Sequence, residues 1–192
     1  MLGYTGTFEG RPISVQTTGM GCPSAGIVFE ELAQLGARRF VRVGTCGGLL
    51  DGMKMGDTVV AMSATADDTT PIRYSGVKGF SPTATFALVR AAVDLASAEG
   101  STVHVGPIVT SGLFYDPDPT AFAKWKSTGH VGVEMEAAMM YTVAATHDIE
   151  ALAMMTVSDV LGDDGSTVRI SDEELKRGVD TMMHLACRIA VS

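Results

Sequence analysis

The stretch GVEMEAA, residues 132–138, joins an apolar strand to an Ala-rich helix. In a strand, Glu134 and Glu136 point to one side and Met135 to the other, and at a strand end the three can converge on one pocket. Carboxylates accept hydrogen bonds from a polyol, and a thioether offers a soft apolar surface. The stretch therefore fits a sugar with a flat apolar ring attached. The alternative is a solvated strand end beside a core methionine.

Strands and helices alternate on both sides of this stretch. Apolar runs predict a hairpin of strands over residues 4–8 and 13–17, and later strands over 40–43, 58–64, 103–109 and 151–157. Helices are expected before Gly36, over 119–126 and over 135–146. A further helix is expected after the cap Ser81-Pro82, with Phe86, Val89 and Val93 on one face, and Ser171 and Glu174 predict a capping box at the start of the last helix. A polar loop is expected over 67–79.

This order of elements predicts an α/β fold. We expect a single domain over residues 1–192, with a mixed central β-sheet flanked by helices. The core of the sheet should be largely parallel, and the opening hairpin should make it mixed.

Composition and charge exclude several classes of protein. The 192 residues are 46% hydrophobic and 19% charged, which is typical of a globular domain. The formal net charge of −8 argues against a broad surface for nucleic acid or for an anionic membrane. Three widely spaced cysteines predict neither a disulfide framework nor a zinc site, and they favour a cytoplasmic location. No signal peptide or membrane span is predicted.

Three segments with polar side chains each follow an apolar strand: residues 44–48, residues 134–136, and Ser158-Asp159. Ligands of α/β folds gather at the carboxyl ends of strands, so we expect one shared site. In the first segment, glycines let backbone N–H groups approach an oxyanion, while Thr45 and Arg42 supply further donors. An arginine inside a buried strand also needs an anionic partner. The alternative is a structural turn.

Two other positions offer chemistry suited to a nucleobase. Asp159 can donate a proton as a general acid, although an aspartate at this place can equally cap or form a turn. Phe114 and Tyr115 can stack on a planar base, although aromatic pairs near turns often serve packing alone.

Together these segments resemble the nucleoside phosphorylase superfamily, and within it the hexameric bacterial-type purine nucleoside phosphorylases. The matching segments occur in the family's order across nearly the whole chain: GYTGT (3–7), GMGCPS (19–24), RVGTCG (42–47), FY (114–115), VEMEAA (133–138) and TVSD (156–159). Each segment is weak alone, whereas the ordered set is specific.

The resemblance implies a role for particular residues. The implied binding groups are Arg42 and Thr45 for phosphate, Met20, Met135 and Glu136 for ribose, and Phe114, Glu134, Ser158 and Asp159 for the base. Asp159 would protonate the leaving purine at N7, and Arg169 is the candidate that assists it. No metal is implied.

The resemblance also implies an activity. It is the phosphorolytic cleavage of the N-glycosidic bond of purine ribo- or deoxyribonucleosides to free base and pentose 1-phosphate. Inorganic phosphate would be the co-substrate, with no cofactor. Family members specific for 6-oxopurines carry Asn where this chain has Asp159, so adenosine-type substrates are expected as well. The family is oligomeric, so we expect a homo-oligomer, a dimer-based hexamer.

The family normally opens with a further strand that ends in a Gly-Asp-Pro-x-Arg phosphate loop, and this chain begins downstream of it. We therefore expect an unpaired sheet edge that oligomer contacts cover. The difference keeps two alternatives open: a hydrolytic nucleosidase of the same superfamily, and a non-catalytic or truncated nucleoside-binding subunit.

Overall fold

The structure is a computed structural model that describes residues 1–161 and 171–192, and the backbone of 167–169. Its strands are β1 (Gly3–Phe8), β2 (Arg11–Gln16), β3 (Arg39–Gly48), β4 (Thr58–Ala66), β5 (Val103–Thr110), β6 (Gly132–Glu134), β7 (Glu150–Leu161) and β8 (Thr167–Arg169). Its helices are α1 (Cys22–Gln34), α2 (Thr70–Ser75), α3 (Phe86–Ala98), α4 (Ala121–Ser127), α5 (Ala137–Thr146) and α6 (Asp172–Ala190).

The main sheet has the strand order β3-β6-β5-β4-β7-β8, and a further pairing of β3 with β7 closes a ring. The pairs β3–β7, β4–β5 and β5–β6 are parallel, while β3–β6, β4–β7 and β7–β8 are antiparallel. The predicted mixed α/β fold is therefore confirmed. The predicted cause of the mixing is wrong, because β1 and β2 form a separate two-stranded sheet.

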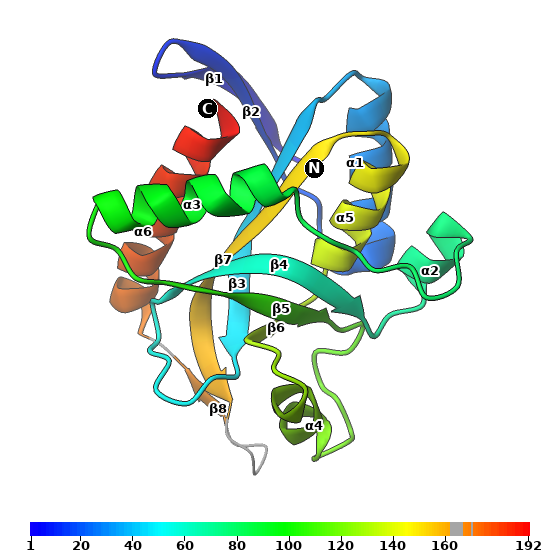
Figure 1. The fold of residues 1–192 in the computed structure, drawn as a ribbon, viewed down its shortest axis with the longest axis vertical. Helices are drawn as coiled ribbons and strands as arrows, with labels where there is room; N and C mark the ends of the chain where they lie inside the picture. Colours follow the sequence, from blue (N-terminus) through cyan, green and yellow to red (C-terminus); the bar gives the residue numbers. More distant parts are fainter. Residues whose placement is uncertain (162–166, 170) are drawn as a thin grey trace.

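Helices cover both faces of the main sheet (Figure 1), with α1 and α5 on one side and α3 and α6 on the other. Strand β7 lies between these layers, so both of its faces are buried over residues 151–158, and residues 151–155 are all apolar. Ala153 and Met155 pack in the core cluster with α1 and α5, while Leu152 and Met154 pack in the cluster with α3 and α6.

The glycine-rich segment 44–48 differs from its prediction. It continues β3 and pairs with β7 up to Gly48, with a register shift between Cys46 and Gly47. Close packing explains these glycines, because a Cβ on Gly47 would lie 2.7 Å from Leu161 and one on Gly48 would lie 2.5 Å from the sulfur of Met53. The glycines thus leave room for the side chains of Leu161 and Met53 to pack directly against the backbone of β3.

Two further predictions along the chain need correction. Helix α2 lies within the expected loop 67–79, and α3 begins at Phe86 after Thr85 rather than at Ser81-Pro82. The chain is extended before α3 because Ala64 donates to the Pro82 carbonyl and Ala84 donates to the Met62 carbonyl. Phe86 is exposed, and the buried face of α3 comprises Leu88, Val89, Ala92 and Ala96.

Strand β3 carries the expected unpaired edge. One side pairs with β7 along its whole length, whereas β6 covers the other side only at Gly47 and Gly48. Among the described strands, none pairs with this second side between Arg39 and Cys46. In the described part of the chain, no helix is long and apolar enough to cross a membrane.

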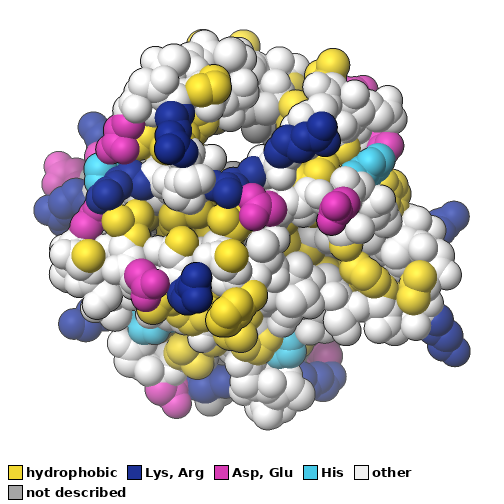
Figure 2. Space-filling view, turned by 45° about the horizontal axis from the view of Figure 1, so that its top comes forward, with side chains coloured by type: hydrophobic (Ala, Val, Ile, Leu, Met, Phe, Trp, Pro, Cys, Tyr) yellow, Lys and Arg dark blue, Asp and Glu magenta, His cyan; other side chains and the backbone are white. Residues whose placement is uncertain are grey.

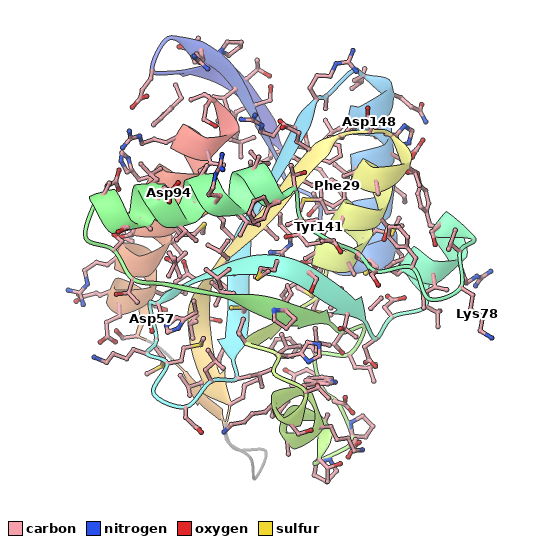
Figure 3. The ribbon with its side chains drawn as sticks, viewed as in Figure 1. Phe29, Asp57, Lys78, Asp94, Tyr141 and Asp148 are labelled. Carbon is pink, nitrogen blue, oxygen red and sulfur yellow. The ribbon has the colours of Figure 1, made fainter. Side chains whose placement is uncertain are left out.

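Tyr141 ties α5 to the sheet from within the core (Figure 3). Its hydroxyl donates to the Ala61 carbonyl at 2.7 Å and accepts from the Ala153 N–H at 2.9 Å, and its side chain is almost fully buried. Ala61 and Ala153 face each other at the last register position of the β4–β7 pair. The phenol therefore completes that pair where β4 turns away at its irregularity after Ala61.

We expect Tyr141→Phe to lower the free energy of unfolding by about 1–3 kcal/mol, because it leaves a buried N–H and a buried C=O without partners. Urea unfolding followed by circular dichroism measures this change. Tyr4→Phe on exposed β1 is the matched control and should change stability by less than about 0.5 kcal/mol. Equal stability of the two variants would show that the phenol does not complete the sheet.

Candidate active site

A cavity of about 1150 Å³ lies where β3, β6 and β7 converge. The structure brings to it all three segments that were predicted to meet. The lining includes every predicted site residue whose side chain is described: Met20, Arg42, Thr45, Phe114, Glu134, Met135, Glu136, Ser158 and Asp159. The side chain of Arg169 lies outside the described part of the structure, but the backbone of Arg169 pairs with Asp159 across β8 and β7.

The cavity is open to solvent and longer than the polar site alone. Figure 2 shows that one face of the molecule is hollowed, with Lys and Arg side chains around the opening. The lining continues along the unpaired edge of β3 between β2 and α6, where Met183, Ala186 and Cys187 contribute an apolar wall. The polar site thus lies at one end of a partly apolar cleft.

Arg42 lies at the floor of the polar end, between two carboxylates. Its Nη2 is 3.0 Å from Glu134 Oε2 and also donates to Glu136 Oε2. The side chain is only 11% exposed. Burial lowers the pKa of Arg42, but Glu134 and Glu136 more than offset burial and hold the pKa above its ordinary value. The anionic partner that a buried strand arginine needs is therefore supplied by the chain itself.

The other terminal nitrogen of Arg42 has no acceptor in the part of the chain that the structure describes. Nη1 is buried and lacks a hydrogen-bond partner among the described residues. It lies over Gly44, where a Cβ would come within 2.7 Å of it. The exposed Thr45 follows directly on β3. A guanidinium donor, a glycine and a hydroxyl thus adjoin at this end of the cavity, which is the chemistry that an oxyanion requires.

Glu134 is held on all sides by the protein. Its side chain is 1% exposed and accepts from the N–H of Glu136 at 2.7 Å and from the N–H of Ala137 at 2.9 Å. The Thr110 hydroxyl donates to its Oε1 at 2.5 Å. These bonds satisfy N–H groups at the start of α5, where a carboxylate is also favoured by the helix dipole.

Sequence reasoning missed Thr110. Its signal was present, because a hydroxyl stands at the carboxyl end of the predicted strand 103–109, directly beside the expected site. A buried threonine at a strand end is common, however, and the sequence does not reveal that Glu134 lies within reach.

Glu136 joins the turn before α1 to the site. Its Oε1 accepts from the Gly21 N–H at 2.6 Å, while its other oxygen contacts Arg42. Gly21 has φ +82°, a conformation that favours glycine. Met20 precedes it and is largely exposed at the cavity wall.

On β7, Ser158 and Asp159 form a pair at the cavity edge. The Ser158 hydroxyl donates to Asp159 Oδ2 at 2.7 Å, so one carboxyl oxygen is oriented by the neighbouring residue. Asp159 also faces Gly47 in the β3–β7 register, just past the irregularity in β3. The bulge thus places this carboxyl group beside the glycine-rich strand end.

Phe114 and Tyr115 line the cavity from the loop after β5. Their rings meet edge to face with centroids 5.0 Å apart, and they are 71% and 89% exposed. Such exposure is unusual for large aromatic side chains and marks a surface that another molecule can cover.

Two thiols adjoin the buried charges. Burial, with Glu134 adding to it, raises the pKa of Cys46 to about 12. Burial followed by the charge of Asp68 raises the pKa of Cys22 to about 12 as well. Among the described residues, no three His, Cys, Asp or Glu side chains are grouped so as to hold a metal ion.

Comparison with known proteins identifies related sequences along the whole chain. The sequence model of the phosphorylase superfamily matches residues 1–191. A DeoD-type purine nucleoside phosphorylase of Clostridium beijerinckii is 47% identical over 161 residues, which cover 83% of this chain and 68% of the relative. Proteins of the same description from Clostridium perfringens and Exiguobacterium sp. are 41% and 42% identical, covering 100% of this chain and 81% and 80% of the relatives.

Proposed function

The chain belongs to the phosphorylase superfamily, and we propose that it cleaves purine nucleosides with inorganic phosphate. The products are the free purine base and ribose 1-phosphate, or deoxyribose 1-phosphate from a deoxynucleoside. The names of the relatives, each described as a DeoD-type purine nucleoside phosphorylase, support this activity.

The observation that carries the proposal is the contact between Arg42 and Glu136. An anion on the arginine and a polyol on the carboxylate would be immediate neighbours, as attack of phosphate on a sugar carbon requires. The unpartnered Nη1 and the Thr45 hydroxyl would supply further donors to phosphate. Glu136 would accept hydrogen bonds from the ribose hydroxyls.

The rest of the cavity suits the other parts of a nucleoside. Met20 and Met135 would contact the apolar face of the sugar, and Phe114 would pack on the purine ring. Ser158 and Asp159 line the cavity from β7, next to the end of β3, and would face the purine N7. Arg169 is proposed to assist the acid, because the β7–β8 register places its backbone opposite Asp159.

In the proposed reaction, phosphate replaces the purine on the sugar and the base leaves with a proton. The bond from C1′ to N9 breaks, and the base takes the electron pair together with a proton that Asp159 delivers to N7. The sugar passes through an oxocarbenium-like state, which phosphate stabilises by its charge before its oxygen bonds to C1′. The phosphate loses a proton on becoming an ester dianion, and Asp159 recovers one from solvent. No organic cofactor is proposed.

We expect wild-type protein to release hypoxanthine from inosine only when phosphate is present. Arg42→Ala should lower kcat/KM for phosphate at least about 100-fold, since it removes the charge-assisted donors. Ultraviolet assays across a phosphate series measure both effects, and Arg90→Ala on exposed α3 is the control. Base release that is indifferent to phosphate and to Arg42→Ala would identify a hydrolase. Nucleoside binding without turnover would identify a non-catalytic subunit.

Asp159→Asn should change substrate preference. An amide cannot deliver a proton to N7, so we expect turnover of adenosine to fall by about 10²–10⁴-fold. Turnover of inosine should fall much less, because an amide can still donate a hydrogen bond to a 6-oxopurine. Separate kcat measurements on the two nucleosides test this. The control Ser158→Ala is expected to lower kcat by the same factor for both. An equal fall in kcat for adenosine and inosine in Asp159→Asn would contradict the proposed role of Asp159 as the acid.

We further propose that the protein is a cytoplasmic homo-oligomer, a dimer-based hexamer. The exposed aromatic side chains of Phe114 and Tyr115 at the cavity mouth, together with exposed Met20, support a covering subunit. The free state of Cys22, Cys46 and Cys187 supports a reducing compartment.

Light scattering at micromolar concentration should give a mass of about six chains if the proposed hexamer forms. Association is expected because the exposed apolar side chains at the cavity mouth are unfavourable in water when uncovered. Phe114→Ser with Tyr115→Ser should shift the distribution toward smaller species. A monomeric wild-type protein would contradict the proposed assembly.

A further inference from the structure

We propose that Glu134 is a positioning residue for the anion-binding arginine, held in place by Thr110, and that it does not bind the purine. The inference rests on the proposed function in one respect, namely that the anion on Arg42 is phosphate. It concerns two side chains whose contacts are made within the protein.

Glu134 has no acceptor capacity left for a substrate. A carboxylate offers about four lone-pair sites. Oε1 accepts from the Thr110 hydroxyl and from the Ala137 N–H, while Oε2 accepts from the Glu136 N–H and contacts Arg42 Nη2. Four donors of the protein therefore fill this carboxylate, and its side chain is almost fully buried.

Thr110 orients the Glu134 carboxylate from the buried side, away from the cavity. Its hydroxyl donates to Glu134 and accepts from the Ala138 N–H at 2.9 Å, so its orientation is determined by both bonds. Thr110 is fully buried and is absent from the cavity lining. Any effect of Thr110 on a ligand must therefore pass through Glu134 or through the start of α5.

The two carboxylates around Arg42 differ in what holds them. Besides Arg42, Glu136 accepts from the Gly21 N–H, and it reaches the cavity where a sugar would bind. Glu134 is tied to β5 and α5 by three donors other than Arg42. When Glu136 turns to the hydroxyls of a sugar, Glu134 remains as the fixed hold on Nη2. The guanidinium group of Arg42 is then held so that Nη1 stays over Gly44, where an oxyanion would bind.

The decisive variant is Thr110→Val, which is close to isosteric and removes the hydroxyl. We expect KM for phosphate to rise about five- to tenfold, or ~1–1.4 kcal/mol, because Glu134 loses one of its anchors. KM for the nucleoside should stay within about twofold. Thr110→Ser keeps the hydroxyl and should restore the phosphate KM. Thr142→Val is a matched control, since Thr142 is equally buried, bonds to the Ala138 carbonyl and does not line the cavity.

Glu134→Gln separates positioning from two other roles and keeps the test decisive if Thr110→Val does not fold. A positioning role predicts that KM for phosphate rises at least about tenfold. A simple counter-charge predicts the opposite, because Arg42 would attract phosphate more strongly once one carboxylate is neutral. A base-binding role predicts a rise in KM for the nucleoside instead. Either of these last two results overturns the proposal.

Calorimetric titration with inorganic phosphate measures the Kd for phosphate directly, so the positioning role can be tested without turnover. If wild-type protein binds phosphate without cleaving nucleosides, the proposed function fails, and the ratio of phosphate Kd between Thr110→Val and Thr110→Ser still tests the positioning role. A ratio near one overturns that role even in an active enzyme. Failure of the wild type to bind phosphate overturns both.

Discussion

The buried guanidinium of Arg42 and its two carboxylates constrain the rest of the site. A cation at this depth is tolerated only with anionic partners, and each carboxylate in turn needs donors that water no longer supplies. The donors are the backbone of α5, the Thr110 hydroxyl and the Gly21 N–H. The ends of β3, β5 and β6 and the starts of α1 and α5 are thereby fixed relative to one another. The mixed sheet supplies these ends at one place because its ring brings β3, β6 and β7 together.

Local patterns in the sequence predicted most of the fold. The GVEMEAA junction, the opening hairpin and the capping box at Ser171 depend on neighbours within a few residues, and the structure has all three. Helix α2 was missed because its six residues are too few to show a helical period. The glycines of β3 were assigned to a loop because their role depends on Leu161 and Met53, which only the folded chain brings near.

The site was predictable in its residue types and less so in its contacts. The strand-end rule correctly brought Arg42, the acidic run and Asp159 to one cavity. The partners of Arg42 were not predictable, because Glu136 is 94 residues away and nothing local signals the ion pair. The same limit applies to Thr110, whose hydroxyl gains importance only from the carboxylate that folding places beside it.

The buried thiols next to this charge network have a consequence for the chemistry of the protein in an oxidising medium. Peroxides and disulfides react with the thiolate, and a thiol with a pKa of about 12 is almost entirely protonated at neutral pH. Burial is the largest cause of the raised pKa of both thiols, followed at Cys22 by the charge of Asp68, and the charge of Glu134 adds to it at both Cys22 and Cys46. The carboxylate that holds the arginine thus adds to burial in disfavouring the reactive thiolate form of both neighbouring cysteines.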